Sequence, residues 1–169
     1  MKTRSEIIFQ WSVYSAVSLL VLLVQKLLLP QLQLFGVSLF LPPMIAAMLS
    51  AFEPGAEGML FSLFFGVLCD WALIGPVPCF YTVSFVLAAI LAGLISGRML
   101  SGQLLCSITV SAAAYLTGTL LRWVLMASDG VGLITVLLYG GKELLLALPF
   151  VVPLHFLYAF FYHRFHFYD

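Results

Sequence analysis

The sequence predicts an all-α, polytopic membrane protein that forms a single integral membrane domain over residues 1–169. Hydrophobic residues make up 63% of the chain and charged residues only 8%, and the mean hydropathy is +1.15. A soluble globule of this length needs more polar surface than these residues supply. Basic and acidic side chains number seven each and are scattered, so we expect no basic face that binds nucleic acid.

Six apolar segments have the length of a helix that crosses a bilayer. Prolines, glycines and charged residues divide the chain into stretches of about 17 to 25 residues, the length that a helix needs to cross about 30 Å of hydrocarbon. The sequence therefore predicts a bundle of six transmembrane helices, at residues 7–29, 35–52, 58–74, 80–96, 103–127 and 142–162.

A shorter apolar stretch precedes the last of these helices. Residues 131–139 would form only about 13 Å of helix, too little to cross the membrane, and Gly140 and Gly141 separate them from the next segment. We expect an interfacial or re-entrant piece there. The paired prolines inside the second and sixth segments predict kinks, because proline removes a backbone donor from the helix. These prolines are Pro42, Pro43, Pro149 and Pro153.

The basic residues indicate an orientation. Cytoplasmic loops and ends of membrane proteins carry an excess of lysine and arginine. With both termini cytoplasmic, four basic residues lie inside and two lie outside, which is the favoured arrangement. The inside residues are Lys2, Arg4, Arg98 and Arg164, and the outside residues are Lys26 and Lys142.

Asp70 is the only charged residue between Gly58 and Gly75. A charge at the centre of a bilayer costs at least about 2.5 kcal/mol, so this carboxylate needs a partner or a polar cavity. Small residues precede it at intervals of four, forming one stripe on the predicted helix. Such a stripe lets two helices approach closely in lipid, and it consists of Gly58, Ser62 and Gly66.

The fifth predicted helix repeats this device with Ala114, Gly118 and Arg122. The third and fifth helices run in the same direction, and Asp70 and Arg122 each lie about a turn and a half from the outer end. We therefore predict that these two residues form an ion pair. Lys142 and Glu143 open the sixth helix on the same side, which extends the pair to a cluster of four charges. Such a cluster either locks helices together or takes part in transport or catalysis.

Two further positions have alternative interpretations. Ala89, Gly93 and Gly97 are four residues apart on the fourth helix, as in an internal packing seam or a docking face for a partner's helix. His155 lies in the last helix, where a hydrogen-bonded histidine is a more common finding than a proton carrier.

Motifs for hydrolysis, zinc binding and nucleotide binding are absent from the sequence. We therefore expect no catalytic residues, no metal site and no cofactor, and we expect a protein that is not an enzyme.

The segment from Pro42 to Ser96 resembles the MreD family of rod shape-determining membrane proteins. That family has a Gly-x-x-x-Gly-Leu-x-x-Asp stretch followed by a glycine-containing loop. Here Ser62, Gly66, Val67 and Asp70 stand at the motif positions, and the loop reads Gly-Pro-Val-Pro from Gly75. Serine replaces the first glycine of the motif and valine replaces its leucine.

The resemblance implies a non-enzymatic subunit of the bacterial cell-elongation complex, which makes peptidoglycan and maintains rod shape. The expected location is the cytoplasmic (inner) membrane. Besides membrane lipids, the implied partners are an MreC-like protein, a RodA-like glycosyltransferase with its transpeptidase, and an MreB-like filament. The resemblance also implies a fold similar to that of the substrate-binding subunits of energy-coupling-factor transporters.

A transporter subunit of that kind is the alternative function. Such subunits usually present an Ala-x-x-x-Ala face on the first helix, and Ala16 is the only alanine in the first predicted helix here. The charged cluster around Asp70 would supply polar groups for a ligand.

Overall fold

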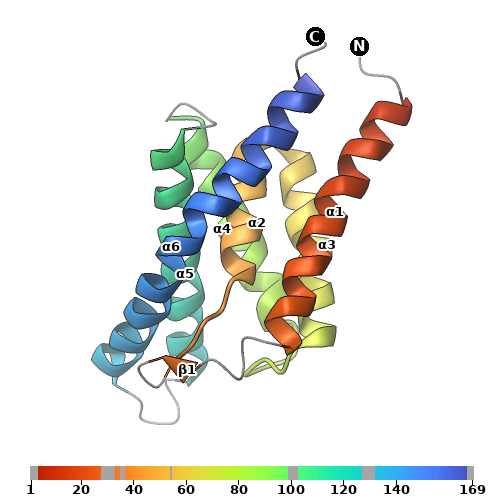
Figure 1. Ribbon diagram of the computed structural model, residues 1–169. Helices are drawn as coiled ribbons and strands as arrows, with labels where there is room; N and C mark the ends of the chain where they lie inside the picture. Colours follow the sequence, from red (N-terminus) through yellow and green to blue (C-terminus); the bar gives the residue numbers. More distant parts are fainter. Residues whose placement is uncertain are drawn as a thin grey trace.

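A computed structural model of the chain describes residues 4–27, 33–34, 37–53, 55–98, 103–126 and 132–166. These residues form six helices and one short antiparallel hairpin, in which Leu34 pairs with Val37 (Figure 1). The elements are α1 (Arg4–Leu27), β1 (Gln33–Leu34), β2 (Val37–Ser38), α2 (Pro42–Phe52), α3 (Ala56–Ala72), α4 (Phe80–Ser96), α5 (Leu104–Met126) and α6 (Leu133–His166).

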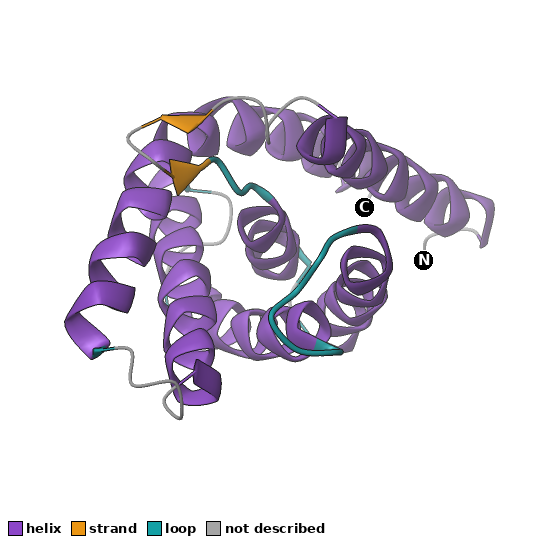
Figure 2. Cartoon of the chain, turned by 90° about the horizontal axis from the view of Figure 1, so that it is seen from below, coloured by secondary structure: helices purple, strands orange, loops and turns teal. Residues whose placement is uncertain are grey.

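Helix α2 forms the centre of the bundle. All 11 of its residues are buried, and it contacts each of the other five helices. Figure 2 shows the other helices arranged around it. Small residues make this position possible, because Ala46, Ala47, Ser50 and Ala51 let neighbouring backbones approach closely.

The second predicted transmembrane segment is wrong in its first half. Residues 35–52 were expected to be helical, but α2 begins only at Pro42 and is about 16 Å long. Pro42 and Pro43 open the helix instead of kinking it, because backbone N–H groups in a first turn have no helical acceptor to lose. The chain before them is held by Gln25, whose side chain donates to the Leu39 carbonyl at 2.9 Å and accepts from the Leu41 amide at 3.0 Å.

The separate piece at residues 131–139 is also wrong. Residues 133–139 belong to α6, one continuous helix of 34 residues and about 51 Å. Gly140 does not end the helix. Its missing side chain leaves room for Thr119 and so lets α5 and α6 approach closely. Pro149 and Pro153 both lie inside α6.

Among the described residues, three helical stretches are long and apolar enough to cross a membrane: Ile8–Leu27, Leu104–Leu125 and Leu133–Arg164. The first residue of α1 and the last of α6 lie at the same end of the bundle (Figure 1). These features are those of a multi-pass membrane protein. We call the opposite end, where α3 and α5 finish, the hairpin end, because β1 and β2 lie there.

Candidate functional site

Asp70 caps the first turn of α4. Its Oδ1 accepts a hydrogen bond from the Tyr81 amide at 2.9 Å, and its Oδ2 accepts from the Thr82 amide at 2.9 Å and from Thr82 Oγ1 at 2.6 Å. Cys79, at the N-cap position of α4, makes no side-chain hydrogen bond to the helix. A carboxylate from α3 therefore satisfies amides that a helix normally leaves open at its start, and it lies at the positive end of the α4 dipole.

The predicted Asp70–Arg122 ion pair is replaced by a different pair. Arg122 Nη1 lies 3.6 Å from Glu143 Oε1 of α6, while the Asp70 carboxylate is engaged with α4. The prediction matched the two residues by depth alone. It missed that the short connection after α3 brings the open amides of α4 next to Asp70. Lys142, the fourth residue of the predicted cluster, is exposed.

The stripe of small residues on α3 lies against α2 and α4. A Cβ atom added at Gly58 would lie 2.8 Å from Ser50 Cα, and one added at Gly66 would lie 2.6 Å from Thr82 Cα. Between them, the Ser62 hydroxyl lies 2.9 Å from that of Ser50. Gly66 thus brings α3 and α4 close together one turn before the Asp70 cap.

The other small residues divide into buried and open positions. Ala114 of α5 is fully buried, and a Cβ atom at Gly118 would meet the Ser84 hydroxyl of α4 at 3.3 Å. On α4, Ala89 is buried. Gly93, however, has no described atom within 4 Å of an added Cβ.

Gly97, the last residue of that α4 series, is exposed. A Cβ atom added there would meet only carbonyl oxygens of α4 itself. This series therefore packs inside the bundle at Ala89 and is open at its other end.

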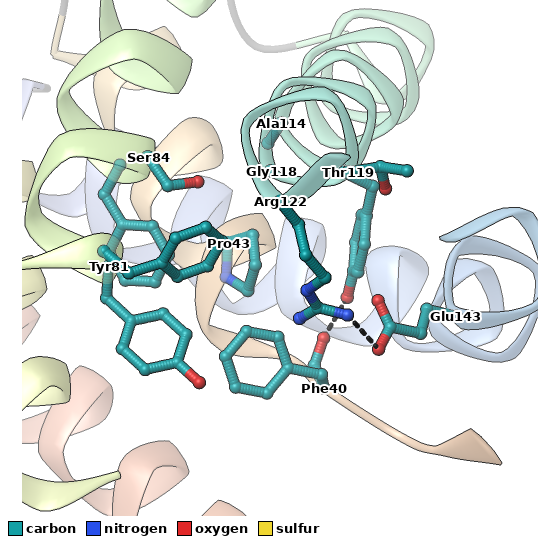
Figure 3. Close-up of a pocket in the computed structure, with 12 residues that line it drawn as sticks. Phe40, Pro43, Tyr81, Ser84, Ala114, Gly118, Thr119, Arg122 and Glu143 are labelled. Atoms are coloured by element: carbon teal, nitrogen blue, oxygen red, sulfur yellow. Dashed lines mark hydrogen bonds and ion pairs between the residues drawn. The ribbon is translucent and has the colours of Figure 1, made fainter. Parts of the chain in front are cut away.

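A narrow pocket lies at the hairpin end, between α4, α5 and α6. Arg122 and Glu143 point toward one another across it, and Ser84 points toward α5 (Figure 3). The rings of Phe80 and Tyr139 each lie 5.9 Å from the Arg122 guanidinium carbon, close enough for cation–π attraction. The pocket is lined by Phe40, Pro43, Phe80, Tyr81, Ser84, Phe85, Ala114, Tyr115, Gly118, Thr119, Arg122 and Glu143.

Other polar contacts join helices nearer the opposite end. His155 is buried and hydrogen-bonded inside the bundle, as expected, with its Nδ1 2.7 Å from the Ser107 hydroxyl of α5. Sequence reasoning missed Glu53, which accepts hydrogen bonds from Gln10 at 2.5 Å and Tyr14 at 3.4 Å. A carboxylate between two apolar segments was the available signal. Among the described residues, no three His, Cys, Asp or Glu side chains gather as a metal site would require.

Comparison of the chain with protein-family models, with curated proteins and with solved structures finds no match.

Proposed function

We propose that this chain is a non-enzymatic membrane subunit of the bacterial cell-elongation complex, in which it acts as a scaffold through helix docking. The proposed location is the cytoplasmic membrane, with both termini in the cytoplasm. The proposed partners are an MreC-like protein and the RodA-like glycosyltransferase with its transpeptidase. These partners are the ones that the resemblance of residues 42–96 to the MreD family implies.

One observation carries the scaffold role: the polar side chains of the bundle are used mainly to join helices. Asp70 links α3 to α4, and Ser62 links α3 to α2. His155 links α6 to α5. A catalyst would need such groups directed at a substrate, whereas a scaffold needs a fixed arrangement of helices that presents a constant surface.

The open end of the α4 series is the proposed docking face. Gly93 has open space where a side chain would lie, and Leu94 beside it is 64% exposed. A partner's helix can approach this surface closely, which is the main source of helix association in lipid.

A pull-down from membranes tests this proposal. The tagged chain should retain cell-wall synthesis proteins, identified by mass spectrometry, and its depletion should produce rounded cells. Gly93→Leu should reduce their recovery without loss of folded protein. Gly141→Leu is the matched control, because Gly141 on α6 also has no described atom within 4 Å of an added Cβ. Equal recovery of the cell-wall synthesis proteins with both variants would show that the α4 face does not dock a partner. Normal cell shape after depletion of the chain would refute the scaffold role.

The alternative function is a substrate-binding subunit of an energy-coupling-factor type transporter. The pocket around Arg122 and Glu143 favours it, because polar groups converge there from three helices. Its size favours the scaffold, since it leaves room for only about one water molecule. Retention of a small molecule through purification, together with recovery of an ATPase module, would establish the transporter instead.

A further inference from the structure

The most buried side chains of α1 join this helix to the bundle through hydrogen bonds. On the described part of α1, the buried side chains are Gln10, Tyr14, Ser18, Leu22 and Gln25. Tyr14 donates to Glu53 at the end of α2, and the Ser18 hydroxyl lies 3.2 Å from that of Tyr158 on α6. Gln25 holds the chain before α2. These bonds fix α1 against α2 and α6.

On its other side, a cavity of about 220 Å³ separates α1 from α3. The Trp11 and Phe61 rings lie 6.0 Å apart, and Phe61 stacks on Phe65 at 5.9 Å, so these rings pack against one another and leave the space beside them open. Leu19 and Phe64 are 48% and 66% exposed, which places the opening toward the surrounding lipid. The residues that line the cavity include Trp11, Ser18, Leu19, Phe61, Phe64 and Leu68.

The lining of this cavity suits an apolar ligand. Among the described residues, no buried side-chain nitrogen or oxygen lacks a hydrogen-bond partner, and the Ser18 hydroxyl is engaged with Tyr158. An apolar cavity of about 150 Å³ stays free of water and is large enough to bind benzene. A further helix, about 10 to 12 Å across with its side chains, is too wide for this space. A hydrocarbon chain has both the chemistry and the width that the cavity accepts.

The depth of the cavity matches one leaflet of a bilayer. The apolar stretch of α1 begins at Ile8, at the end of the bundle opposite the hairpin (Figure 1). Along the helix, Trp11 lies about 5 Å beyond Ile8 and Leu19 lies about 17 Å beyond it. One leaflet has about 15 Å of hydrocarbon. The cavity therefore follows most of the path of an acyl chain in the leaflet at that end.

We propose that the cavity between α1 and α3 binds one acyl chain of a membrane phospholipid, whose headgroup lies at the end of the bundle opposite the hairpin. The bound chain packs against the aromatic rings of the cavity and fills the space between the two helices. Packing of this kind is the main source of association in lipid, so the chain joins α1 to α3 as the hydrogen bonds join α1 to α2 and α6. This site is independent of the proposed scaffold role.

Tryptophan fluorescence of the full chain tests the site, because bromine atoms on an acyl chain quench a tryptophan that they touch. The double variant Trp71→Phe, Trp123→Phe leaves Trp11, which lines the cavity, as the remaining tryptophan. The double variant Trp11→Phe, Trp123→Phe leaves Trp71, which is 89% exposed and does not line the cavity, as the matched control. In vesicles of dibrominated phosphatidylcholine, both variants should be quenched relative to vesicles of the same lipid without bromine.

Extraction from these vesicles into excess detergent separates a bound chain from the lipid around the protein. Trp71 should regain its fluorescence, because the lipid that it touches exchanges with detergent. Trp11 should stay quenched, because the chain in the cavity is held between two helices. Recovery of Trp11 to the same extent as Trp71 would overturn the proposal, and so would a Trp11 that bromine does not quench in the vesicles.

A pair of serines on α1 locates the bound chain. Ser15 and Ser12 are both exposed, but Ser15 lines the cavity and Ser12 does not. In the variant that keeps Trp11, Ser15→Phe should reduce the quenching that remains in detergent at least about tenfold, because a ring and a chain cannot fill the same space. Ser12→Phe should leave this quenching unchanged. Equal quenching in the two variants would refute the location.

Ser15→Ala tests the chemistry of the ligand and keeps the site testable even if Ser15→Phe folds poorly. A hydrocarbon chain accepts no hydrogen bond, so removal of the hydroxyl should leave the quenching of Trp11 in detergent unchanged. Loss of that quenching would show that the ligand needs the hydroxyl and would overturn the acyl chain. These outcomes do not bear on cell shape or on partner recovery, so this site and the scaffold role can fail separately.

Discussion

Replacing Asp70 with alanine should destabilise the bundle by removing the cap on α4. The carboxylate accepts two backbone amides and one hydroxyl of that helix, at 2.6 to 2.9 Å. Alanine leaves the Tyr81 and Thr82 amides without an acceptor beside a buried interface. Asparagine keeps one acceptor oxygen but loses the charge, so Asp70→Asn should be the milder variant.

The size of the effect follows from the bonds lost. An unsatisfied buried donor costs about 1 to 3 kcal/mol, and loss of an N-cap costs about 0.5 to 2 kcal/mol. The favourable position of the charge at the helix start adds about 0.3 to 1 kcal/mol. Because these contributions overlap, we expect about 2 to 4 kcal/mol for Asp70→Ala and about 1 to 2 kcal/mol for Asp70→Asn.

The measurement is the free energy of unfolding of the purified protein in detergent micelles. Increasing mole fractions of sodium dodecyl sulfate unfold the chain, and far-ultraviolet circular dichroism follows the loss of helix. A change of about 2 to 4 kcal/mol alters the unfolding constant by about 30-fold to 1000-fold, well within reach of such titrations.

Double-mutant cycles decide which partner Asp70 has. Asp70→Ala combined with Thr82→Ala should show a coupling of about 1 kcal/mol, because the two side chains are hydrogen-bonded. Asp70→Ala combined with Arg122→Ala should be additive within about 0.5 kcal/mol. A coupling with Arg122 larger than that with Thr82 would refute the cap and restore the ion pair expected from the sequence.

Three further predictions concern other contacts of the bundle. Gly66→Ala should lower the free energy of unfolding by about 1 to 3 kcal/mol, because the added Cβ would force α3 and α4 apart. Gly93→Ala, where the added Cβ meets open space, should leave it unchanged or raise it by up to about 1 kcal/mol. The same micelle titration compares the two variants. Ser107→Ala should cost about 1 to 3 kcal/mol by leaving buried His155 without its hydroxyl partner, and an unchanged unfolding midpoint would contradict this. Cys79 is exposed at the hairpin end while the other two cysteines are buried, so a membrane-impermeant maleimide should label intact cells and Cys79→Ser should abolish that labelling. Labelling only after the cells are opened would reverse the proposed orientation.

Much of the bundle could be predicted because apolar length reports directly on membrane helices. The predicted segment 80–96 has the same bounds as α4, and the predicted segment 103–127 differs from α5 by one residue at each end. The segment 35–52 failed because its apolar composition continues through the residues before Pro42. Contacts with residues far along the chain hold that stretch in a non-helical conformation. Gln25 bonds to Leu39 and Leu41, and the Tyr115 hydroxyl donates to the Phe40 carbonyl. Such contacts leave no periodic signal.

The sequence by itself determined that Asp70 had to be satisfied by protein, because hydrocarbon offers a carboxylate no partner. Only the tertiary structure decided that its partners are two amides of α4, and that Arg122 turns to Glu143 on α6. The cost of burying a charge depends on the residue and its apolar neighbours, which can be read along the chain. The choice of partner depends on which helix ends meet in space, and that is set by the packing of all six helices.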